Sequence, residues 1–264
     1  MFTPRFIYCE QSLIPKYLEQ IAELNLGVEI LFENPADLWP HVRWENLLEL
    51  ADAIAEAEIP VSIHGPFHNL NLASKDAHIR SYSLDTLTGA METARAFHSP
   101  QVVFHTGFLP QYPPKAREKW LDGFSISLEL LLSRAVDLDV RLAMENTYET
   151  DLSLFEQIFE RFPTPALGMC LDTGHAACFG KIEPAEWAHR FADRICHVHC
   201  SDNNGRDDLH LGLGKGVVNF RAQLLPIAKL GGDVSLTLEV GAEDALSSRD
   251  YIDQLVNTLL REES

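Results

Sequence analysis

Histidines and carboxylates recur in this sequence at the ends of short apolar runs, where their chemistry is that of a divalent-metal site. The histidines that follow such runs are His64, His105, His175, His197, His199 and His210. The carboxylates interleaved with them are Glu145, Asp172, Asp208 and Glu239. Imidazole nitrogens and carboxylate oxygens together are ligands that zinc, manganese and cobalt accept. Such side chains are costly to bury singly, so their recurrence favours one shared metal centre.

Each of these residues has an ordinary structural explanation when it is taken alone. A lone His64 or His105 is more often a hydrogen-bonded core histidine than a ligand. Asp172 alone could cap the following turn, and Glu239 alone could pair with an arginine. Successive runs that all end in such residues are much harder to explain in this way. The sequence therefore favours the metal centre over a set of separate structural roles.

The elements that must position these residues are short β-rich apolar runs, each followed by a longer amphipathic stretch. The eight runs are Arg5–Tyr8, Gly27–Glu33, Val61–Phe67, Gln101–Gly107, Arg141–Thr147, Ala166–Thr173, Ile195–Asp202 and Val234–Val240. Their spacing of about 25 to 40 residues suits one strand–helix unit each. We expect an α/β protein that forms a single (β/α)8 TIM barrel domain over residues 1–264. In such barrels the active site lies at the carboxyl ends of the strands, which is where the polar residues fall.

Helix signals and the start of the chain support the closed barrel. Helices are expected after Ser12, from Ser74 to about Phe97, after Asp151 and from Ser247 to Leu260. The main alternative, a doubly wound open sheet, needs a glycine-rich turn after its first strand to bind a nucleotide. The segment Cys9–Ser12 contains no glycine, so we favour the barrel.

Composition and charge restrict the class of protein. The chain of 264 residues carries a formal net charge of −18, which disfavours a protein that binds nucleic acid through its phosphates. No apolar run approaches the roughly 18 residues that a membrane span needs, and the N-terminus shows no secretory signal. The five cysteines form no C-x-x-C pair, which suits a reducing compartment. We therefore expect a cytoplasmic protein without membrane contacts; its oligomeric state, including a homo-oligomer, stays open.

A glycine-rich stretch after the seventh run is a candidate phosphate-binding loop. Gly214, Lys215 and Gly216 could cradle a phosphate, since many barrels bind one near this position. A mobile loop explains the same glycines equally well. His197 lies one step deeper than His199 on the same face, so we expect it to support the centre from behind rather than to bind the metal.

The polar motifs together resemble the xylose-isomerase-like TIM barrel superfamily, which includes sugar phosphate isomerases, epimerases and endonuclease IV. The motifs are His64–Gly65–Pro66, His105–Thr106–Gly107, Glu145–Asn146, Asp172–Thr173–Gly174–His175, His199–Cys200–Ser201–Asp202, Asp208–Leu209–His210 and Glu239. The resemblance extends from Gly27 to Glu239, which is nearly the whole chain. No single motif is specific, whereas the complete set is.

The isomerase and epimerase branch implies one divalent metal, which the family holds through two glutamates, an aspartate and a histidine. The matching residues are Glu145, Asp172, His199 and Glu239. The resemblance implies a zinc-, manganese- or cobalt-dependent isomerase or epimerase of a sugar or sugar phosphate, which transfers a proton through a metal-stabilised enediolate. Glu145 and Glu239 would be the catalytic pair, one removing the proton and the other returning it.

Endonuclease IV is the alternative that the resemblance offers: an AP endonuclease family 2 phosphodiesterase with a di- or trinuclear zinc site. It uses nine ligands, and its five remaining positions match His64, His105, His175, Asp208 and His210. In the sugar branch these five residues would be additional metal ligands or substrate contacts. The acidic composition and the few basic residues after the first four runs favour a small-molecule substrate over DNA.

Two other classes of function use the same barrel. A noncatalytic sugar-binding barrel would not need a carboxylate pair beside the ligands, so we rank it last. A dehydratase or lyase would share the enediolate chemistry, because a fold does not set the reaction.

Overall fold

Eight parallel strands close into a barrel, as the sequence predicts. The computed structural model describes residues 2–262. Its strands are β1 Arg5–Glu10, β2 Gly27–Leu31, β3 Val61–His64, β4 Gln101–His105, β5 Arg141–Glu145, β6 Leu167–Asp172, β7 Ile195–Cys200 and β8 Ser235–Leu238. Each strand pairs with the next in the chain, and β8 pairs with β1 to close the sheet. The fold is therefore a TIM barrel and not an open sheet.

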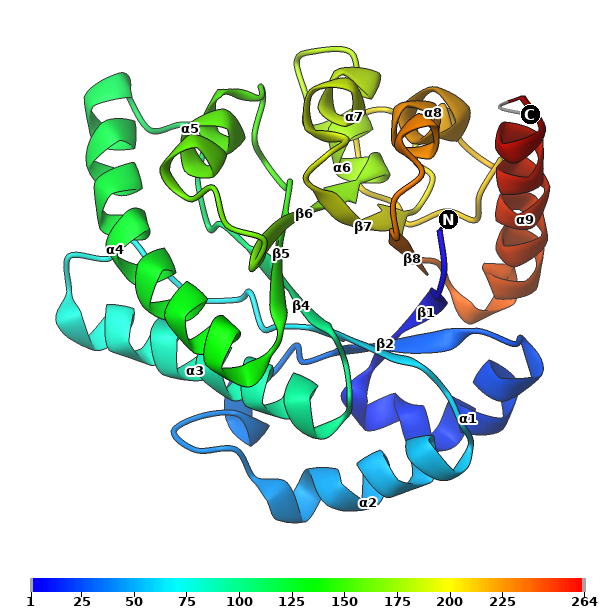
Figure 1. The fold of residues 1–264 in the computed structure, drawn as a ribbon, viewed down its shortest axis with the longest axis horizontal. Helices are drawn as coiled ribbons and strands as arrows, with labels where there is room; N and C mark the ends of the chain where they lie inside the picture. Colours follow the sequence, from blue (N-terminus) through cyan, green and yellow to red (C-terminus); the bar gives the residue numbers. More distant parts are fainter. Residues whose placement is uncertain (1, 263–264) are drawn as a thin grey trace.

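Helices surround the strands on the outside of this barrel (Figure 1). The α-helices are α1 Ile14–Glu23, α2 Trp44–Glu56, α3 Ala77–Ala96, α4 Pro114–Leu138, α5 Ser153–Arg161, α6 Thr173–Cys178, α7 Ala185–Phe191, α8 Phe220–Leu230 and α9 Ala245–Glu262. Short 3-10 turns at Gln11–Leu13, Pro35–Asp37 and Ala242–Asp244 join some of them to the strands. Within residues 2–262, no helix has both the length and the apolar character needed to cross a bilayer.

The strands read as near-continuous apolar runs because both of their faces are covered. Every residue of β2, β3, β6, β7 and β8 is buried. One face of each strand packs against the helices, and the other fills the barrel interior. This is the pattern expected for parallel strands that have helices on their outer face. Charged residues on these strands are therefore held inside the protein and must find partners there.

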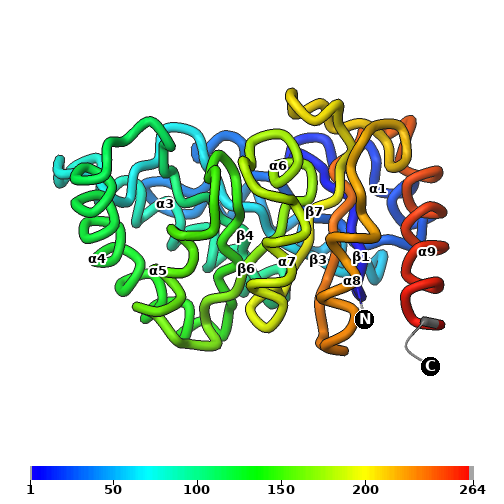
Figure 2. The backbone as a smooth tube through the Cα atoms, turned by 90° about the horizontal axis from the view of Figure 1, so that it is seen from above, coloured from blue at the N-terminus to red at the C-terminus, as the bar shows by residue number. Residues whose placement is uncertain are grey.

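Strand register brings the polar ends together. His105 on β4 is aligned with Glu145 on β5, and Asp172 on β6 is aligned with His199 on β7. The β6–β7 pairing shifts between Met169 and Cys170, which sets the alignment beyond that point. The segment that follows β7, yellow in Figure 2, rises above the rim at this end of the barrel.

Two helix starts differ from the sequence prediction by a few residues. Helix α3 begins at Ala77 and not after Ser74, because the Asp76 carboxylate accepts hydrogen bonds from the His78 and Ile79 amides and caps the helix there. Helix α9 begins at Ala245, directly after a 3-10 turn that the sequence pattern did not indicate.

Gly27 at the start of β2 allows a close approach that we expect to be needed for barrel closure. A Cβ added at Gly27 would lie 2.7 Å from the Pro60 carbonyl oxygen and would also meet the Phe6 ring. Gly27→Ala should therefore lower the free energy of unfolding by about 1–3 kcal/mol, measured by urea denaturation. Gly232→Ala is the matched control, since no heavy atom lies within 4 Å of its added Cβ. Equal stability of the two variants would contradict this account.

Candidate metal centre

The nine residues singled out in the sequence come together at the carboxyl end of the barrel. Seven of them line one cavity of about 540 Å³: His64, His105, Glu145, His175, Asp208, His210 and Glu239. Asp172 and His199 lie beneath it and are at most 1% exposed. Residues from β3 to β8 and the loop after β7 thus contribute to a single site.

Three of the histidines are oriented by backbone carbonyl groups. The Nδ1 atoms of His64, His175 and His210 lie 2.9, 3.0 and 3.1 Å from the carbonyl oxygens of Gly65, Asn146 and Glu239, respectively. A carbonyl oxygen only accepts, so Nδ1 must carry a proton in each ring. The Nε2 lone pair of each neutral ring is then free for another partner, and all three Nε2 atoms face carboxylates.

Those Nε2 atoms approach oxygens that also only accept. His64 Nε2 lies 3.2 Å from a Glu145 oxygen, and the Nε2 atoms of His175 and His210 lie 3.2 and 3.1 Å from the same Asp208 oxygen. A lone pair and a carboxylate repel each other unless a proton or a metal ion lies between them. Contact with Asp208 accordingly raises the pKa of His210 to about 9. A divalent metal would replace these protons.

Glu145 is the carboxylate that most of the imidazoles share. His64 and His105 contact its Oε2, at 3.2 and 3.1 Å, and His175 Nδ1 lies 3.1 Å from its Oε1. Although burial opposes ionisation, His105 and His199 hold the pKa of Glu145 well below its ordinary value. Oε2, which faces the Nε2 atoms of His64 and His105, is therefore placed to bind a metal, whereas Oε1 faces the protonated Nδ1 of His175.

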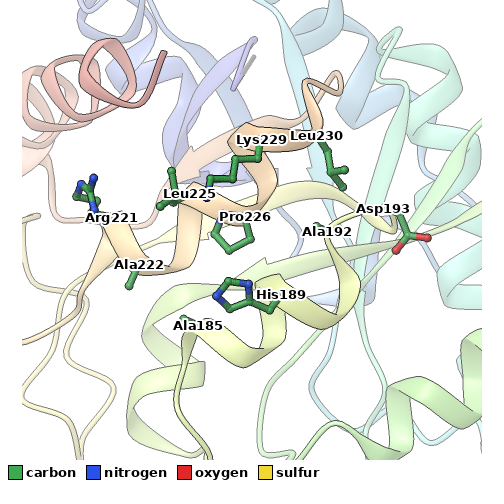
Figure 3. A pocket seen from close by; sticks show the side chains of 10 residues that line it. All are labelled: Ala185, His189, Ala192, Asp193, Arg221, Ala222, Leu225, Pro226, Lys229 and Leu230. Atoms are coloured by element: carbon green, nitrogen blue, oxygen red, sulfur yellow. The ribbon is translucent and has the colours of Figure 1, made fainter. Parts of the chain in front are cut away.

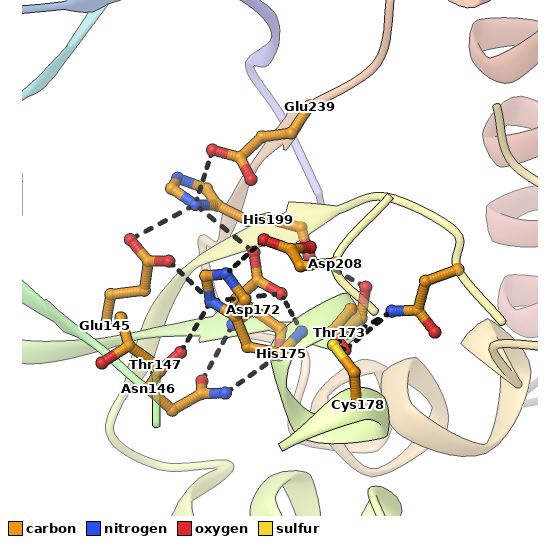
Figure 4. Close-up of polar contacts among 12 residues, drawn as sticks. Glu145, Asn146, Thr147, Asp172, Thr173, His175, Cys178, His199, Asp208 and Glu239 are labelled. Atoms are coloured by element: carbon orange, nitrogen blue, oxygen red, sulfur yellow. Dashed lines mark hydrogen bonds and ion pairs between the residues drawn. The ribbon is translucent and has the colours of Figure 1, made fainter. Parts of the chain in front are cut away.

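His199 points its Nδ1 atom at the carboxylates of the sequence-predicted ligand set (Figure 4). Nδ1 lies 3.2 Å from Glu239, 3.5 Å from Glu145 and 3.9 Å from Asp172. Among the described residues, neither this Nδ1 nor Asp172 Oδ2 has a hydrogen-bond partner, although both are buried. Orphaned donor atoms of these types, converging from neighbouring strands, fit a divalent metal.

Asp172 serves the capping role that the sequence suggested for it, and one of its oxygens has no hydrogen-bond partner among the described residues. Its Oδ1 accepts a hydrogen bond of 2.5 Å from the His175 amide and so caps α6. Its backbone exchanges hydrogen bonds with the Asn146 side chain, which holds the end of β6 against β5. These contacts leave Oδ2 free, so the cap also fixes the direction of the unpartnered oxygen.

Potential ligand atoms form compact groups across the cavity. In three of these groups the ligand atoms lie within 4.8 Å of one another: His64, His105 and Glu145; Glu145, Asp172 and His175; and His175, Asp208 and His210. A fourth group joins His64, His199 and Glu239. The four predicted ligands of a single metal are therefore divided between two groups that His199 Nδ1 connects. The centre therefore offers enough ligand atoms for one metal ion, and the remaining groups offer ligand atoms for additional ions.

The glycine-rich loop does not present free donors to a phosphate. The amides of Gly214 and Gly216 donate to Asp202 Oδ2 at 3.0 and 2.9 Å. The Lys215 ammonium pairs with Asp244. The two amides and the ammonium group predicted to bind a phosphate are thus already paired within the protein, because the Asp202 carboxylate accepts hydrogen bonds from the amides and Asp244 pairs with Lys215. These groups are therefore given no role in substrate binding.

Two buried carboxylates near the centre were not assigned a role there from the sequence. Glu149 accepts hydrogen bonds from Thr106 Oγ1 and the Thr147 amide, at 2.6 and 2.8 Å, and burial raises its pKa. Glu29 is fully buried on β2 and contacts His199. Glu33, four residues further along the chain, is exposed and lies 3.9 Å from His68.

A second depression lies on the outer surface between α7 and α8 (Figure 3). Its lining includes His189, Pro226 and Lys229. It is formed by helix surfaces and not by the ends of the strands. It therefore has no part in the centre described above.

Comparison with known proteins gives a family match over most of the chain. A family model described as a xylose isomerase-like TIM barrel matches residues 18–261. An uncharacterized protein of Methanocaldococcus jannaschii, MJ1311, is 31% identical over 258 residues, which cover 93% of this chain and 85% of that protein.

Two further similarities name different kinds of enzyme. A solved structure described as a D-tagatose 3-epimerase-like protein has a TM-score of 0.85 and 26% identity, covering 98% of this chain and 99% of its own. A probable endonuclease 4 of Natranaerobius thermophilus is 35% identical over 62% of this chain and 59% of that protein. The two branches indicated by the sequence motifs are thus both represented among the similar proteins.

The buried Glu239 carboxyl should make the metal-free protein sensitive to pH. Burial raises its pKa to about 7 against the opposing effect of His199. A carboxyl whose pKa is raised on folding contributes stability that is fully present below the pKa of the unfolded chain and is lost as the pH rises through 7. In the presence of a chelator, the melting temperature of Glu239→Gln relative to the wild type should therefore increase from pH 5 to pH 8. Each kcal/mol corresponds to about 2–4 °C. A pH-independent difference would contradict the assignment.

Proposed function

The chain belongs to the xylose isomerase-like TIM barrel family, and from this premise we propose that it is a divalent-metal-dependent isomerase or epimerase of a sugar. The observation that carries the proposal is the approach of two glutamates to one histidine nitrogen. Glu239 and Glu145 lie 3.2 and 3.5 Å from His199 Nδ1. A metal held at this nitrogen would be within reach of both carboxylates.

The two carboxylates differ in their affinity for protons, which suits a transfer between them. Burial raises the pKa of Glu239 to about 7, whereas His105 and His199 hold the pKa of Glu145 well below its ordinary value against the effect of burial. A general base or acid works best when its pKa is near the operating pH. Glu239 is thus the more basic of the two in the metal-free protein, and we assign the proton transfer at the substrate carbon first to Glu239. Glu145 would act on the opposite side of that carbon.

A proton-transfer reaction of this kind uses the residues of the centre in distinct roles. When bound, a divalent metal supplies Lewis-acid stabilisation of negative charge on the substrate oxygens. Asp172, His199, Glu145 and Glu239 would hold it. Glu239 takes the proton from the carbon next to the carbonyl group, and the proton returns to the same or a neighbouring carbon. His175 is placed to donate to a substrate oxygen.

The side chains that form the walls of the cavity favour a small, uncharged substrate. Phe67, Leu70, Phe108, Tyr112 and Tyr148 contribute apolar and aromatic surface above the polar floor. The described residues that line the cavity include no lysine or arginine. A sugar presents apolar C–H faces and hydroxyl groups, which match such walls, whereas a phosphate group would be expected to meet cationic side chains.

A second candidate is supported by the additional ligand groups. His64, His105 and Glu145 form one group, and His175, Asp208 and His210 form another, on either side of the predicted single-metal site. Three zinc ions held in this way would suit a phosphodiesterase that activates a bridging hydroxide. The similarity to a probable endonuclease 4 supports this reaction class. The acidic chain and a cavity whose described lining includes no lysine or arginine favour the sugar substrate.

Metal content should separate the two candidates. Protein purified without chelator should contain about one manganese, cobalt or zinc ion per chain, measured by elemental analysis. His105→Ala should leave this content unchanged, because His105 belongs to an outer group of ligands. Close to three zinc ions in the wild type, with fewer in His105→Ala, would instead support the phosphodiesterase and lead to an abasic-site cleavage assay. Failure to bind any metal after reconstitution would exclude both.

Proton transfer can be tested independently of the identity of the product. In deuterated water, the wild type should exchange substrate carbon-bound hydrogen, measured by NMR over a panel of ketoses. Glu239→Gln should lower this exchange about 10²–10⁴-fold, since the amide cannot take the proton. Glu145→Gln should do the same. The control is Glu33→Gln. Glu33 is an exposed glutamate just after β2, and this variant should retain the wild-type rate.

Exchange at the wild-type rate in Glu239→Gln and Glu145→Gln, with the metal still bound, would show that the assigned pair does not transfer the proton.

A further inference from the structure

A fully buried glutamate lies directly beneath the candidate metal centre. Glu29 is in the middle of β2, has no exposed surface and is surrounded by neighbouring strands. An ionised carboxylate is costly to bury, so its retention requires strong partners. None of the steps assigned to the proposed reaction uses Glu29.

Each oxygen of Glu29 contacts a different histidine of β7. Glu29 Oε1 lies 2.8 Å from His199 Nε2, and Oε2 lies 2.9 Å from His197 Nε2. Neither His199 Nε2 nor Glu29 Oε1 has a hydrogen-bond partner among the described residues. Their 2.8 Å contact is therefore an ion-pair contact between two buried atoms that are otherwise unpartnered. The His199 ring lies between Glu29 below and the cavity carboxylates above.

Glu29 is itself held by a closed circuit of buried polar side chains. Ser62 Oγ donates to Glu29 Oε2 at 2.6 Å, and Gln101 Nε2 lies 3.3 Å from Ser62 Oγ and 3.2 Å from Ser235 Oγ. His197 Nδ1 closes the circuit at 2.6 Å from Ser235 Oγ. The five residues come from β2, β3, β4, β8 and β7. We call this circuit the polar ring; it runs from Glu29 through Ser62, Gln101, Ser235 and His197 back to Glu29.

We propose that Glu29 is a positioning residue that keeps the proton of His199 on Nε2, so that the Nδ1 lone pair is directed at the metal. An ionised carboxylate can only accept a proton or hydrogen bond, so the nitrogen facing it must be the protonated one. The other nitrogen then has its lone pair toward Glu145, Asp172 and Glu239. This inference rests on the metal centre of the proposed function and adds the group that orients its histidine.

The alternative explanation is that Glu29 merely fills and cross-links the barrel. A neutral side chain of similar size would do this at lower desolvation cost. It would not impose one tautomer on His199. His64, His175 and His210 obtain their tautomer from backbone carbonyls, whereas the partner at 2.8 Å from His199 Nε2 is a carboxylate. A carboxylate behind a metal-binding imidazole is also a recurrent means of strengthening the ligand.

Glu29→Gln is the variant that separates these explanations. The glutamine amide has the size of the carboxylate but carries a donor on one of its two atoms. Because His197 and Ser62 also present protons to Glu29, the amide leaves at least one of the two histidines facing a donor. We expect zinc affinity, measured by competition with a chromophoric chelator, to fall about 10–100-fold. Glu149→Gln, which also neutralises a buried carboxylate, should keep the wild-type affinity, since Glu149 contacts Thr106 and Thr147.

A second measurement uses the wild type alone, so it stands even if Glu29→Gln fails to fold. In zinc-loaded protein labelled with ¹⁵N-histidine, NMR should show the proton of His199 on Nε2 and the metal on Nδ1. Zinc on Nε2 would overturn the proposal. So would unchanged zinc affinity in folded Glu29→Gln, or an equal loss in Glu149→Gln. A wild type that binds no zinc would instead refute the proposed function, and the role of Glu29 with it.

Discussion

The contact on which the site depends is the one that a protonated imidazole nitrogen makes with the frame of the barrel. His64, His175 and His210 each place Nδ1 against a backbone carbonyl at or near the end of a strand. Because carbonyl groups at the carboxyl end of a parallel barrel are fixed by the strands, the fold itself selects the tautomer. Lone pairs of Nε2 then converge on carboxylates, an arrangement that is stable only with protons or a cation between them.

His199 departs from this arrangement because it lies deeper in the barrel. Its Nε2 is buried among neighbouring strands and meets Glu29, and its Nδ1 faces upward. The interior of the barrel is thus layered: the polar ring lies under His199, and the candidate metal centre lies above it. Gln101 connects β3 and β8 across the barrel axis through Ser62 and Ser235, so the lower layer ties strands together that are not neighbours in the sheet.

Much of the fold and most of the centre could be predicted from the sequence for physical reasons. Strands with two covered faces are near-continuous apolar runs, and a charged residue such as Asp172 at the end of such a run is conspicuous. The role of Glu29 could not be predicted, because its partners are distant in sequence and depend on which strands close the barrel. Glu149 follows a strand within a loop, where a glutamate is unremarkable. The loop at Gly214 was misleading for a related reason: the carboxylate that occupies its amides belongs to Asp202, twelve or more residues earlier.

The choice between one metal and several depends on Glu145 more than on the number of histidines. A metal held beside His64 and His105 would occupy Oε2 of Glu145, an oxygen that a proton transfer needs. Glu239 is different, because burial raises its pKa to about 7 in the metal-free protein. A single-metal enzyme can use Glu239 as its base even if Glu145 remains a ligand throughout. The choice between the two proposed reactions therefore depends first on the Glu239 carboxyl, and the cavity above it combines histidines and carboxylates with aromatic walls and includes no lysine or arginine among the described residues.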